Sequence, residues 1–156
     1  MLYIIMFFGI VLVDQITKTI IDANNVHIEL IEGVFSISNV RNEGAAFSIF
    51  AGKDWAQTFF IVMTVVILIA LCVYLVFSKK ESKMFKSSMV MIMAGAVGNL
   101  IDRIALRSVR DFIYPHFFAN FNVADIFVCV GALLLAIYII FFDREFGSKG
   151  AKADVD

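Results

Sequence analysis

Four stretches without a single charged residue constrain this chain more than any other feature. They cover residues 1–13, 55–78, 89–101 and 126–142, which together make up 67 of the 156 residues. All 27 charged residues lie in the other 89, and 61% of the chain is hydrophobic. Soluble domains are about half apolar and about a quarter charged, whereas this chain is 17% charged. The sequence therefore predicts a small integral membrane protein.

The same composition excludes other classes of protein. The apolar content excludes a disordered chain, and the lack of charged residues flanking an apolar seam excludes a coiled coil. A net charge of −1 excludes a basic nucleic-acid binder. No nucleic-acid partner is therefore expected.

The four stretches differ in how well each can cross a membrane. A helix needs about 20 apolar residues to span the hydrocarbon, at about 1.5 Å per residue. Residues 55–77 and 123–142 meet that length, provided that Asp125 lies near an interface. The stretches 1–13 and 89–101 are too short, so their helices are expected to continue into polar residues, over about 1–22 and 86–104. Function is expected at those polar ends.

The expected fold is an all-α membrane protein with four transmembrane helices and a small extracytoplasmic β-hairpin in the outer loop, residues 24–54, between the first two helices. Residues 26–30 and 35–39 alternate apolar and polar side chains around a turn at Glu32 and Gly33, which favours a hairpin. A packed loop without a ligand is the alternative. Residues 1–146 are expected to form a single domain, followed by a disordered cytoplasmic tail at 147–156.

Lysines set the expected orientation. The loop between the second and third spans contains Lys79, Lys80, Lys83 and Lys86, and the positive-inside rule places such a loop in the cytoplasm. Both termini are then cytoplasmic, and the opposite ends of the spans are extracytoplasmic.

Polar residues inside spans are costly in hydrocarbon and are kept where they pair, line a cavity or do chemistry. Asp14, Lys18 and Asp22 lie at i, i+4 and i+8 on one helical face, where a structural ion pair is the favoured interpretation. Stripes of small and polar residues also run along the third and fourth spans: Gly95, Gly98, Asn99 and Asp102 in the third, and Asn122, Asp125, Cys129, Ala132 and Ala136 in the fourth. All these polar residues lie toward the extracytoplasmic side. The second span has nothing comparable and is expected to be scaffold.

Two carboxylates can meet at that side. Asp111 lies in the loop that leads into the fourth span, 14 residues before Asp125. Within hydrogen-bond range, repulsion and desolvation make such a pair hold one proton at neutral pH. One carboxyl then acts as base and the other as acid, as aspartic proteolysis requires. The spacing leaves open an alternative, in which the aspartates form structural ion pairs with Arg103, Arg107 or Arg110.

Two other functions are weighed. A small four-span transporter or proton-relay subunit also carries intramembrane Asp and Lys, but it predicts polar groups near the midplane and a repeat relating the two halves. A Cys129 nucleophile with His116 as base is disfavoured, because an apolar thiol without a neighbouring cation stays protonated. His27 and His116 are expected at the surface and no set of metal ligands is found, so neither a metal ion nor a cofactor is expected.

Five motifs run from residue 14 to residue 125. They are Asp-Gln-Ile-Thr-Lys at 14–18, Asn-Val-Arg-Asn-Glu-Gly-Ala-Ala-Phe at 39–47, Gly-Ala-Val-Gly-Asn-Leu-Ile-Asp-Arg at 95–103, Asp-Phe-Ile at 111–113 and Phe-Asn-Val-Ala-Asp at 121–125. In order and spacing these motifs resemble the lipoprotein signal peptidase (signal peptidase II) family.

The resemblance implies a four-span aspartic endopeptidase of the bacterial inner membrane, with its active site near the extracytoplasmic face. Such an enzyme removes signal peptides from diacylglyceryl-modified prolipoproteins, cleaving on the amino side of the lipidated cysteine. Lipidated precursors and membrane lipid are the implied partners, no cofactor is implied, and a monomer is expected.

The resemblance also assigns residues. The family's catalytic pair falls on Asp111 and Asp125. Its other recurrent positions, which bind substrate or support the site, fall on Asp14, Lys18, Asn42, Gly44, Asn99, Arg103, Asn122 and Ala124. Two positions depart from the family pattern: Arg110 stands where an apolar residue is usual, and Ile126 stands where Ser is common. Arg110 is expected to lower the pKa of Asp111 if it points inward.

Overall fold

The computed structural model describes residues 1–44, 49–78 and 82–142. Four long helices account for most of them: α1 (Leu2–Ala23), α2 (Ala56–Phe77), α3 (Lys83–Leu106) and α4 (Val123–Phe141). Each is long and apolar enough to cross a membrane, so the four expected spans are confirmed. The expected tail at 147–156, and Lys79 and Lys80 of the lysine loop, lie outside the described residues.

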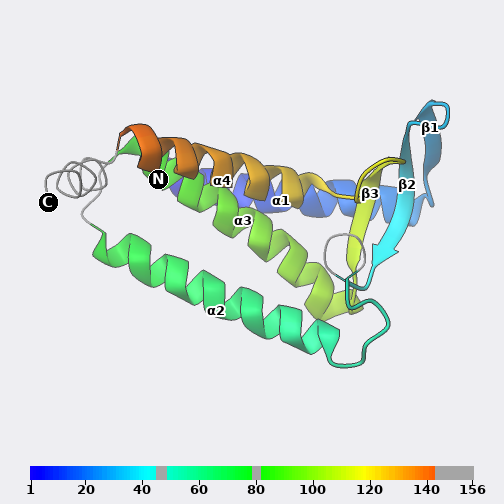
Figure 1. Ribbon diagram of the computed structural model, residues 1–156, viewed down its shortest axis with the longest axis horizontal. Coiled ribbons are helices and arrows are strands. Elements are labelled where there is room, and N and C mark those ends of the chain that lie inside the picture. The colour runs from blue at the N-terminus through cyan, green and yellow to red at the C-terminus, as the bar shows by residue number, and fades with distance from the viewer. Residues whose placement is uncertain (45–48, 79–81, 143–156) are drawn as a thin grey trace, which may run out of the picture.

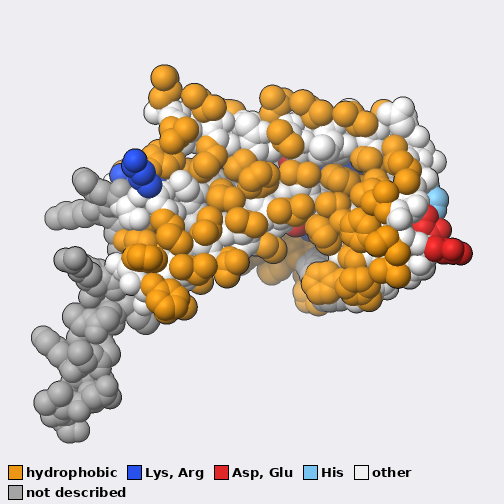
Figure 2. All heavy atoms as spheres, turned by 90° about the horizontal axis from the view of Figure 1, so that it is seen from above, with side chains coloured by type: hydrophobic (Ala, Val, Ile, Leu, Met, Phe, Trp, Pro, Cys, Tyr) orange, Lys and Arg blue, Asp and Glu red, His pale blue; other side chains and the backbone are white. Residues whose placement is uncertain are grey.

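The helices form an open bundle around α3, which packs against each of the other three. Figure 1 shows α1, α3 and α4 running together, while α2 diverges from α3 toward the end of the bundle where α1 begins. Outward-facing residues such as Ile4, Val66 and Leu133 are more than half exposed. Figure 2 shows this apolar surface along the bundle, with charged side chains at its two ends. A helix satisfies its own backbone hydrogen bonds, so such a surface can face lipid.

Glycines bring α3 and α4 into close contact. A Cβ atom added to Gly95 would collide with the carbonyl oxygen of Ala124 and would lie 2.7 Å from Val128 Cγ2. A Cβ atom on Gly131 would lie 2.8 Å from the carbonyl oxygen of Ser88. Small residues at such contacts allow the close packing that holds membrane helices together. This contact places the start of α4 against the middle of α3.

The packed face of α4 differs from the stripe expected from the sequence. Its buried residues are Ala124, Gly131 and Tyr138, whereas Ala132 and Ala136 are exposed. A small side chain permits close packing but does not require it, and an apolar alanine side chain can equally well face lipid. Gly131, where no side chain fits, marks the packed face.

A three-stranded antiparallel sheet lies at one end of the bundle, in the order β1 (His27–Ile31), β2 (Phe35–Asn42) and β3 (Val109–Pro115). The expected hairpin is confirmed as β1 and β2, joined by a turn in which Gly33 has a φ of +65°, a conformation that glycine adopts without strain. The third strand was not expected, because the sequence pattern assigns the segment around Asp111 to a loop. Its pairing with β2 is far away in sequence and leaves no local signal.

The register of β2 and β3 sorts their side chains onto two faces. The adjacent pairs are Val40 with Asp111, Arg41 with Arg110, and Asn42 with Val109. Successive strand residues point to opposite faces, so Asn42 and Asp111 share one face and the two arginines share the other. The register shifts between Ile37 and Val40, as happens at bulges, which often re-aim side chains beside functional sites.

Candidate active site

Asp111 lies on β3 and is only 2% exposed. Its Oδ2 accepts a hydrogen bond from Asn42 Nδ2 at 2.8 Å, and its Oδ1 accepts one from Asn122 Nδ2 at 2.8 Å. Burial raises the pKa of the Asp111 carboxyl to about 6, the negative charge of Asp125 adds to the rise, and the two asparagine hydrogen bonds oppose it. This carboxyl therefore changes its protonation close to neutral pH.

Asp125 lies in the first turn of α4 and helps to form that turn. The backbone N–H of Asn122 donates to Asp125 Oδ2 at 3.0 Å, and the backbone N–H of Asp125 donates to Asn122 Oδ1 at 3.0 Å. This reciprocal capping box satisfies backbone groups that a helix start leaves unpaired. The side chain of Asn99 donates to Asp125 Oδ1 at 2.7 Å. The carboxylate is thus fixed by its own helix and by α3.

Two asparagines connect the aspartates. Asn122 Nδ2 donates to Asn99 Oδ1 at 3.0 Å as well as to Asp111. Asn99 Oδ1 also accepts a hydrogen bond from Lys18 Nζ at 2.9 Å. With its oxygen held by these two donors, the Asn99 side chain presents its NH₂ group to Asp125. The aspartates are therefore oriented by one continuous hydrogen-bond network.

The ion pair expected in α1 is present and fully buried. Lys18 Nζ lies 2.8 Å from Asp14 Oδ2, and the backbone N–H of Ala124 donates to Asp14 Oδ1 at 2.9 Å. The pair thus joins α1 to the start of α4. Asp22, on the same helical face, does not join it: its Oδ1 lies 2.7 Å from Nη2 of Arg41, where both side chains are partly exposed.

Arg103 fastens the outer loop to α3. Its Nη2 donates to the carbonyl oxygen of Gly44 at 2.8 Å, and its Nη1 donates to Gln57 Oε1 at 2.9 Å. Its guanidinium carbon lies 4.5 Å from the centre of the Phe60 ring, a favourable cation–π geometry. The Gly44 N–H in turn donates to Asn42 Oδ1 at 2.9 Å. Asn42 is therefore held by the loop while it binds Asp111.

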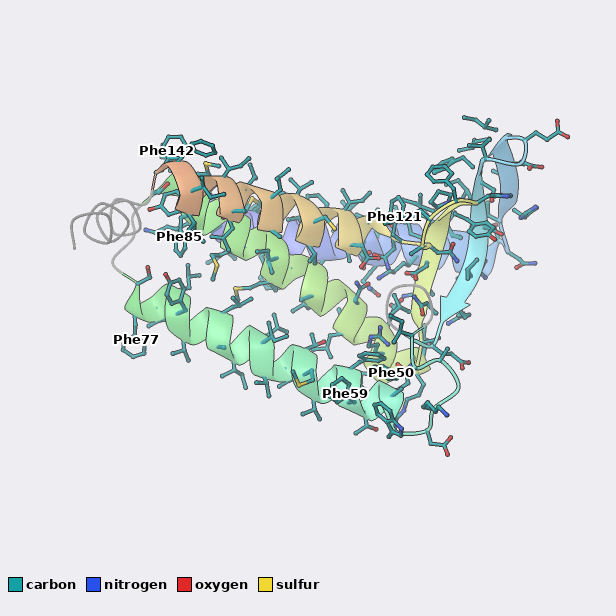
Figure 3. The ribbon with its side chains drawn as sticks, in the orientation of Figure 1. Phe50, Phe59, Phe77, Phe85, Phe121 and Phe142 are labelled. Atoms are coloured by element: carbon teal, nitrogen blue, oxygen red, sulfur yellow. The ribbon has the colours of Figure 1, made fainter. Side chains whose placement is uncertain are left out.

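A cavity of about 530 Å³ lies between these groups. The polar residues that line it are Asn42, Asn99, Arg103, Asp111, Asn120 and Asp125. The apolar residues that line it are Val109, Phe118, Ala119, Phe121, Ile126, Cys129 and Val130. Figure 3 places Phe121 where β3 meets the start of α4. The cavity thus offers both carboxylates to a molecule that also carries apolar groups.

The structure does not show the alternative in which the two aspartates form structural ion pairs with arginines. Within residues 1–44, 49–78 and 82–142, the ion pairs join Lys18, Arg41 and Arg110 to Asp14, Asp22 and Asp102, and none involves Asp111 or Asp125. In the same residues no group of three or more His, Cys, Asp or Glu side chains could hold a metal ion. What the cavity offers is a pair of carboxylates held by amides.

Arg110 points away from Asp111. Its guanidinium binds Asp102 on the other side of β3, with Nη2 at 2.7 Å from Asp102 Oδ1. The expectation that Arg110 lowers the pKa of Asp111 applied to an inward-pointing side chain, and that condition is not met. The other departure from the family pattern, Ile126, lies in the apolar lining of the cavity.

Two glutamines in this network were missed from the sequence. Gln57, on α2, is 8% exposed and donates to the carbonyl oxygen of Glu43 while accepting from Arg103. The second span is therefore more than scaffold, and a polar side chain in the first turn of a charge-free span was the available signal. Gln15 donates to Asp14 Oδ2 at 3.1 Å and to the carbonyl oxygen of Gly98 at 3.0 Å.

The fold and the site together define a class: a multi-span membrane enzyme with two carboxylates facing one cavity at the end of its helices. The family profile described as "Signal peptidase (SPase) II" matches residues 6–141. This chain belongs to the lipoprotein signal peptidase family, also called signal peptidase II, and is an aspartic peptidase of the bacterial membrane.

Individual proteins agree with the family match. The lipoprotein signal peptidase of Geobacter metallireducens is 38% identical over 140 residues, covering 85% of this chain and 86% of the relative. That of Listeria monocytogenes is 36% identical over 160 residues, covering 97% of this chain and 100% of the relative. A bacterial membrane enzyme solved by the in meso method at 2.3 Å resolution superposes with a TM-score of 0.81 at 32% identity, covering 92% of this chain and 90% of that chain.

The transporter alternative is not supported. The polar side chains gather where α1, α3 and α4 meet the sheet, as the hydrogen bonds of Asp14, Asn99 and Asn122 show. A relay through the membrane would need such groups near the midplane.

Proposed function

We propose that Asp111 and Asp125 are the catalytic pair with which this signal peptidase removes signal peptides from diacylglyceryl-modified prolipoproteins, on the amino side of the lipidated cysteine. One observation carries the proposal: both carboxylates line one cavity, and amides rather than cations hold them. A buried carboxyl that forms no direct ion pair retains a proton more easily. The pair can therefore share one proton near neutral pH, as an acid–base pair must.

In the proposed reaction the deprotonated carboxylate takes a proton from a water molecule as the water oxygen attacks the scissile carbonyl carbon. The carbonyl electron pair moves onto its oxygen, and the protonated carboxyl donates a hydrogen bond to that oxyanion. When the tetrahedral intermediate collapses, the C–N bond breaks and the leaving amine takes up a proton from the pair. The pair then again holds one proton.

The surrounding residues have distinct proposed roles. Asn99 and Asn122 orient the two carboxylates. Arg103 and Asn42 hold oxygens of the substrate backbone or of its lipid. Asp14 and Lys18 support the site by fixing α1 to Asn99 and to α4, while Gly44 and Ala124 contribute backbone groups to the same network.

The proposed location of the site explains how it admits such a substrate. A lipidated precursor brings an apolar signal helix and two acyl chains, and the apolar lining of the cavity suits those groups. We propose that the site lies near the extracytoplasmic face of the bacterial inner membrane, so that the precursor enters sideways from the lipid while water still reaches the aspartates. The chain is proposed to act as a monomer with both termini in the cytoplasm.

Asn substitutions test the pair. Asp111→Asn and Asp125→Asn variants of the full chain, in detergent or liposomes with a lipidated precursor, are each expected to lose at least about 100-fold in turnover, as loss of an acid–base group does. The measurement is the size shift of the precursor. Asp22→Asn is the matched control, because Asp22 lies at the same end of the bundle but outside the cavity, and it is expected to cleave normally. Wild-type turnover by either variant of the pair would rule out the proposal.

A further inference from the structure

Arg110 donates three hydrogen bonds to one buried carboxylate, that of Asp102. Its backbone N–H and its Nε both donate to Asp102 Oδ2, at 3.0 and 3.1 Å. Its Nη2 donates to Asp102 Oδ1 at 2.7 Å. Asp102 is fully buried, and a buried carboxylate without a counter-charge is strongly unfavourable. Arg110 therefore supplies most of the hydrogen bonds to Asp102 and the nearer of its two positive charges, since Lys18 Nζ lies 3.7 Å away.

The same side chain joins β3 to α1. Arg110 Nη2 donates to Gln15 Oε1 at 3.0 Å, and Nη1 lies 3.4 Å from Thr19 Oγ1. These contacts hold one face of β3 against α1 and α3. Because neighbouring strand residues point to opposite faces, a strand held this way at Arg110 directs Asp111 toward the cavity.

The contact with Asp102 also affects Lys18. Lys18 Nζ lies 2.8 Å from Asp14 and 3.7 Å from Asp102, and it donates to Asn99 Oδ1 at 2.9 Å. With Arg110 present, this buried cluster contains two carboxylates and two cations. Without Arg110, Lys18 is the remaining cation beside two carboxylates, and Asp102 draws it away from Asn99.

We infer that Arg110 is a positioning residue for the proposed catalytic pair. By neutralising Asp102 it keeps Lys18 on Asn99, which orients Asp125, and by fixing β3 it directs Asp111 at the cavity. The inference rests on the proposed function, because it concerns the geometry of that pair. It also gives a role to a residue that stands where the family usually has an apolar one.

The pH dependence of precursor cleavage tests the positioning role of Arg110. The charged groups that face the two aspartates are Asp14, Lys18 and Arg103, and those that face Arg110 are Asp14, Asp22 and Asp102. Movement of Lys18 toward Asp102 takes its positive charge away from the two aspartates and raises the pH at which the pair takes up its protons. In Arg110→Gln, which keeps an amide donor for Asp102, both limbs of the kcat/KM profile are expected to move to higher pH by about half a unit.

Three further variants make the test specific. Arg41→Gln is the matched control, because Arg41 is the cross-strand partner of Arg110 and pairs with an aspartate at a partly exposed position; its profile is expected to stay in place. Arg110→Lys restores the cation and is expected to return both limbs to the wild-type positions. Asp102→Asn combined with Arg110→Gln removes both charges, so Lys18 stays on Asn99 and the limbs return as well.

The rate adds a second readout. In Arg110→Gln, kcat at the optimum pH is expected to fall about tenfold, while KM stays within about twofold of the wild-type value. Misplaced catalytic groups stabilise the transition state less but leave precursor binding unchanged. Unshifted limbs in Arg110→Gln, or an equal shift in Arg41→Gln, would overturn the role of Arg110. That outcome is distinct from failure of the proposed function, in which the Asn variants of Asp111 or Asp125 would still cleave.

Discussion

At the scale of single residues, Asp111 is held in a balance between burial and hydrogen bonding. Burial raises its pKa to about 6, while Asn42 and Asn122 keep it from rising further. Both asparagines are themselves fixed, one by the Gly44 N–H and the other by the capping box. The amides therefore determine both the direction and the acidity of this carboxyl.

The raised pKa predicts how stability depends on pH. The folded chain binds the Asp111 proton more tightly than the unfolded chain does, so ionising this carboxyl lowers the free energy of unfolding as pH rises from about 4 to about 6. The full cost, above pH 6, is on the order of 3 kcal/mol. The difference in free energy of unfolding between Asp111→Asn and wild type is thus expected to increase in favour of the variant over that range.

Thermal unfolding in detergent, measured for both proteins at several pH values, checks this expectation. The difference at pH 4 serves as the reference, since it already contains the effect of exchanging one hydrogen-bonding group for another. A difference that stays constant from pH 4 to pH 7 would contradict the raised pKa.

Whether a site residue can be predicted from the sequence depends on the kind of interaction that it makes. The pairing of Asp14 with Lys18 can be predicted because a charged side chain in an apolar span is costly unless it has a partner. Gln57 was missed because an uncharged amide in the first turn of a span costs little there, so the signal that it gives is weak. The role of Arg110 escaped because it depends on the face of a strand that the sequence does not reveal.

At the scale of elements, α3 and α4 meet through backbone contact. Gly95 lies against the carbonyl oxygen of Ala124, next to Asp125 in sequence. Gly98 allows Asp14 to reach the same region, because a Cβ atom there would lie 2.6 Å from Asp14 Oδ2. The packing of the helices and the placement of the carboxylates therefore depend on the same glycines.

A single methyl group at this contact is expected to be harmful. Gly95→Ala pushes α4 away from α3, and overpacking of this kind costs about 1–3 kcal/mol. Both the thermal stability in detergent and the rate of precursor cleavage are expected to fall. Gly9→Ala is the matched control, because nothing lies within 4 Å of a Cβ atom at that helical position. A Gly95→Ala chain as stable as Gly9→Ala would mean that the helices can separate without cost.

The helices were predictable and one strand was not. A helix that crosses lipid must have a minimum length and an apolar surface, and both properties can be recognised from consecutive residues of the sequence. The hairpin of β1 and β2 also has a local signal, an alternation around a turn. β3 pairs with a strand almost 70 residues earlier, as Asn42 with Val109 illustrates, and only the folded bundle brings the two together.

At the scale of the whole molecule, the two ends of the helix bundle differ in polarity. One end of the bundle carries the sheet, the cavity and the buried ion pairs, and the other carries the apolar cluster of Phe85, Met89 and Tyr138. Figure 3 shows Phe50 and Phe59 near the first end and Phe77 and Phe142 at the second. Trp and Tyr are enriched at membrane interfaces, and Trp55 lies against both Phe50 and Phe59. The two ends therefore suit two different compartments.

The proposed orientation is open to labelling. Glu32→Cys, at the hairpin turn, is expected to react with a membrane-impermeant maleimide in intact cells. Lys83→Cys, at the start of α3, is expected to react only after the membrane is opened, because the lysine loop is proposed to be cytoplasmic. The parent chain gives the baseline, since Cys72 and Cys129 both lie within spans. The reverse labelling pattern would invert the proposed topology.

The spacing of Asp14 and Lys18 on one helix bears on how the chain is made. α1 is synthesised first, before α3 supplies Asn99 and α4 supplies the Ala124 N–H. A lone charge costs up to about 2.5–3.5 kcal/mol on insertion scales, the value at the centre of a span, but residues at i and i+4 can neutralise each other within their own helix. α1 can thus enter the bilayer with this pair already closed. The later helices then dock onto a finished ion pair, so the order of synthesis is also an order of assembly for the site.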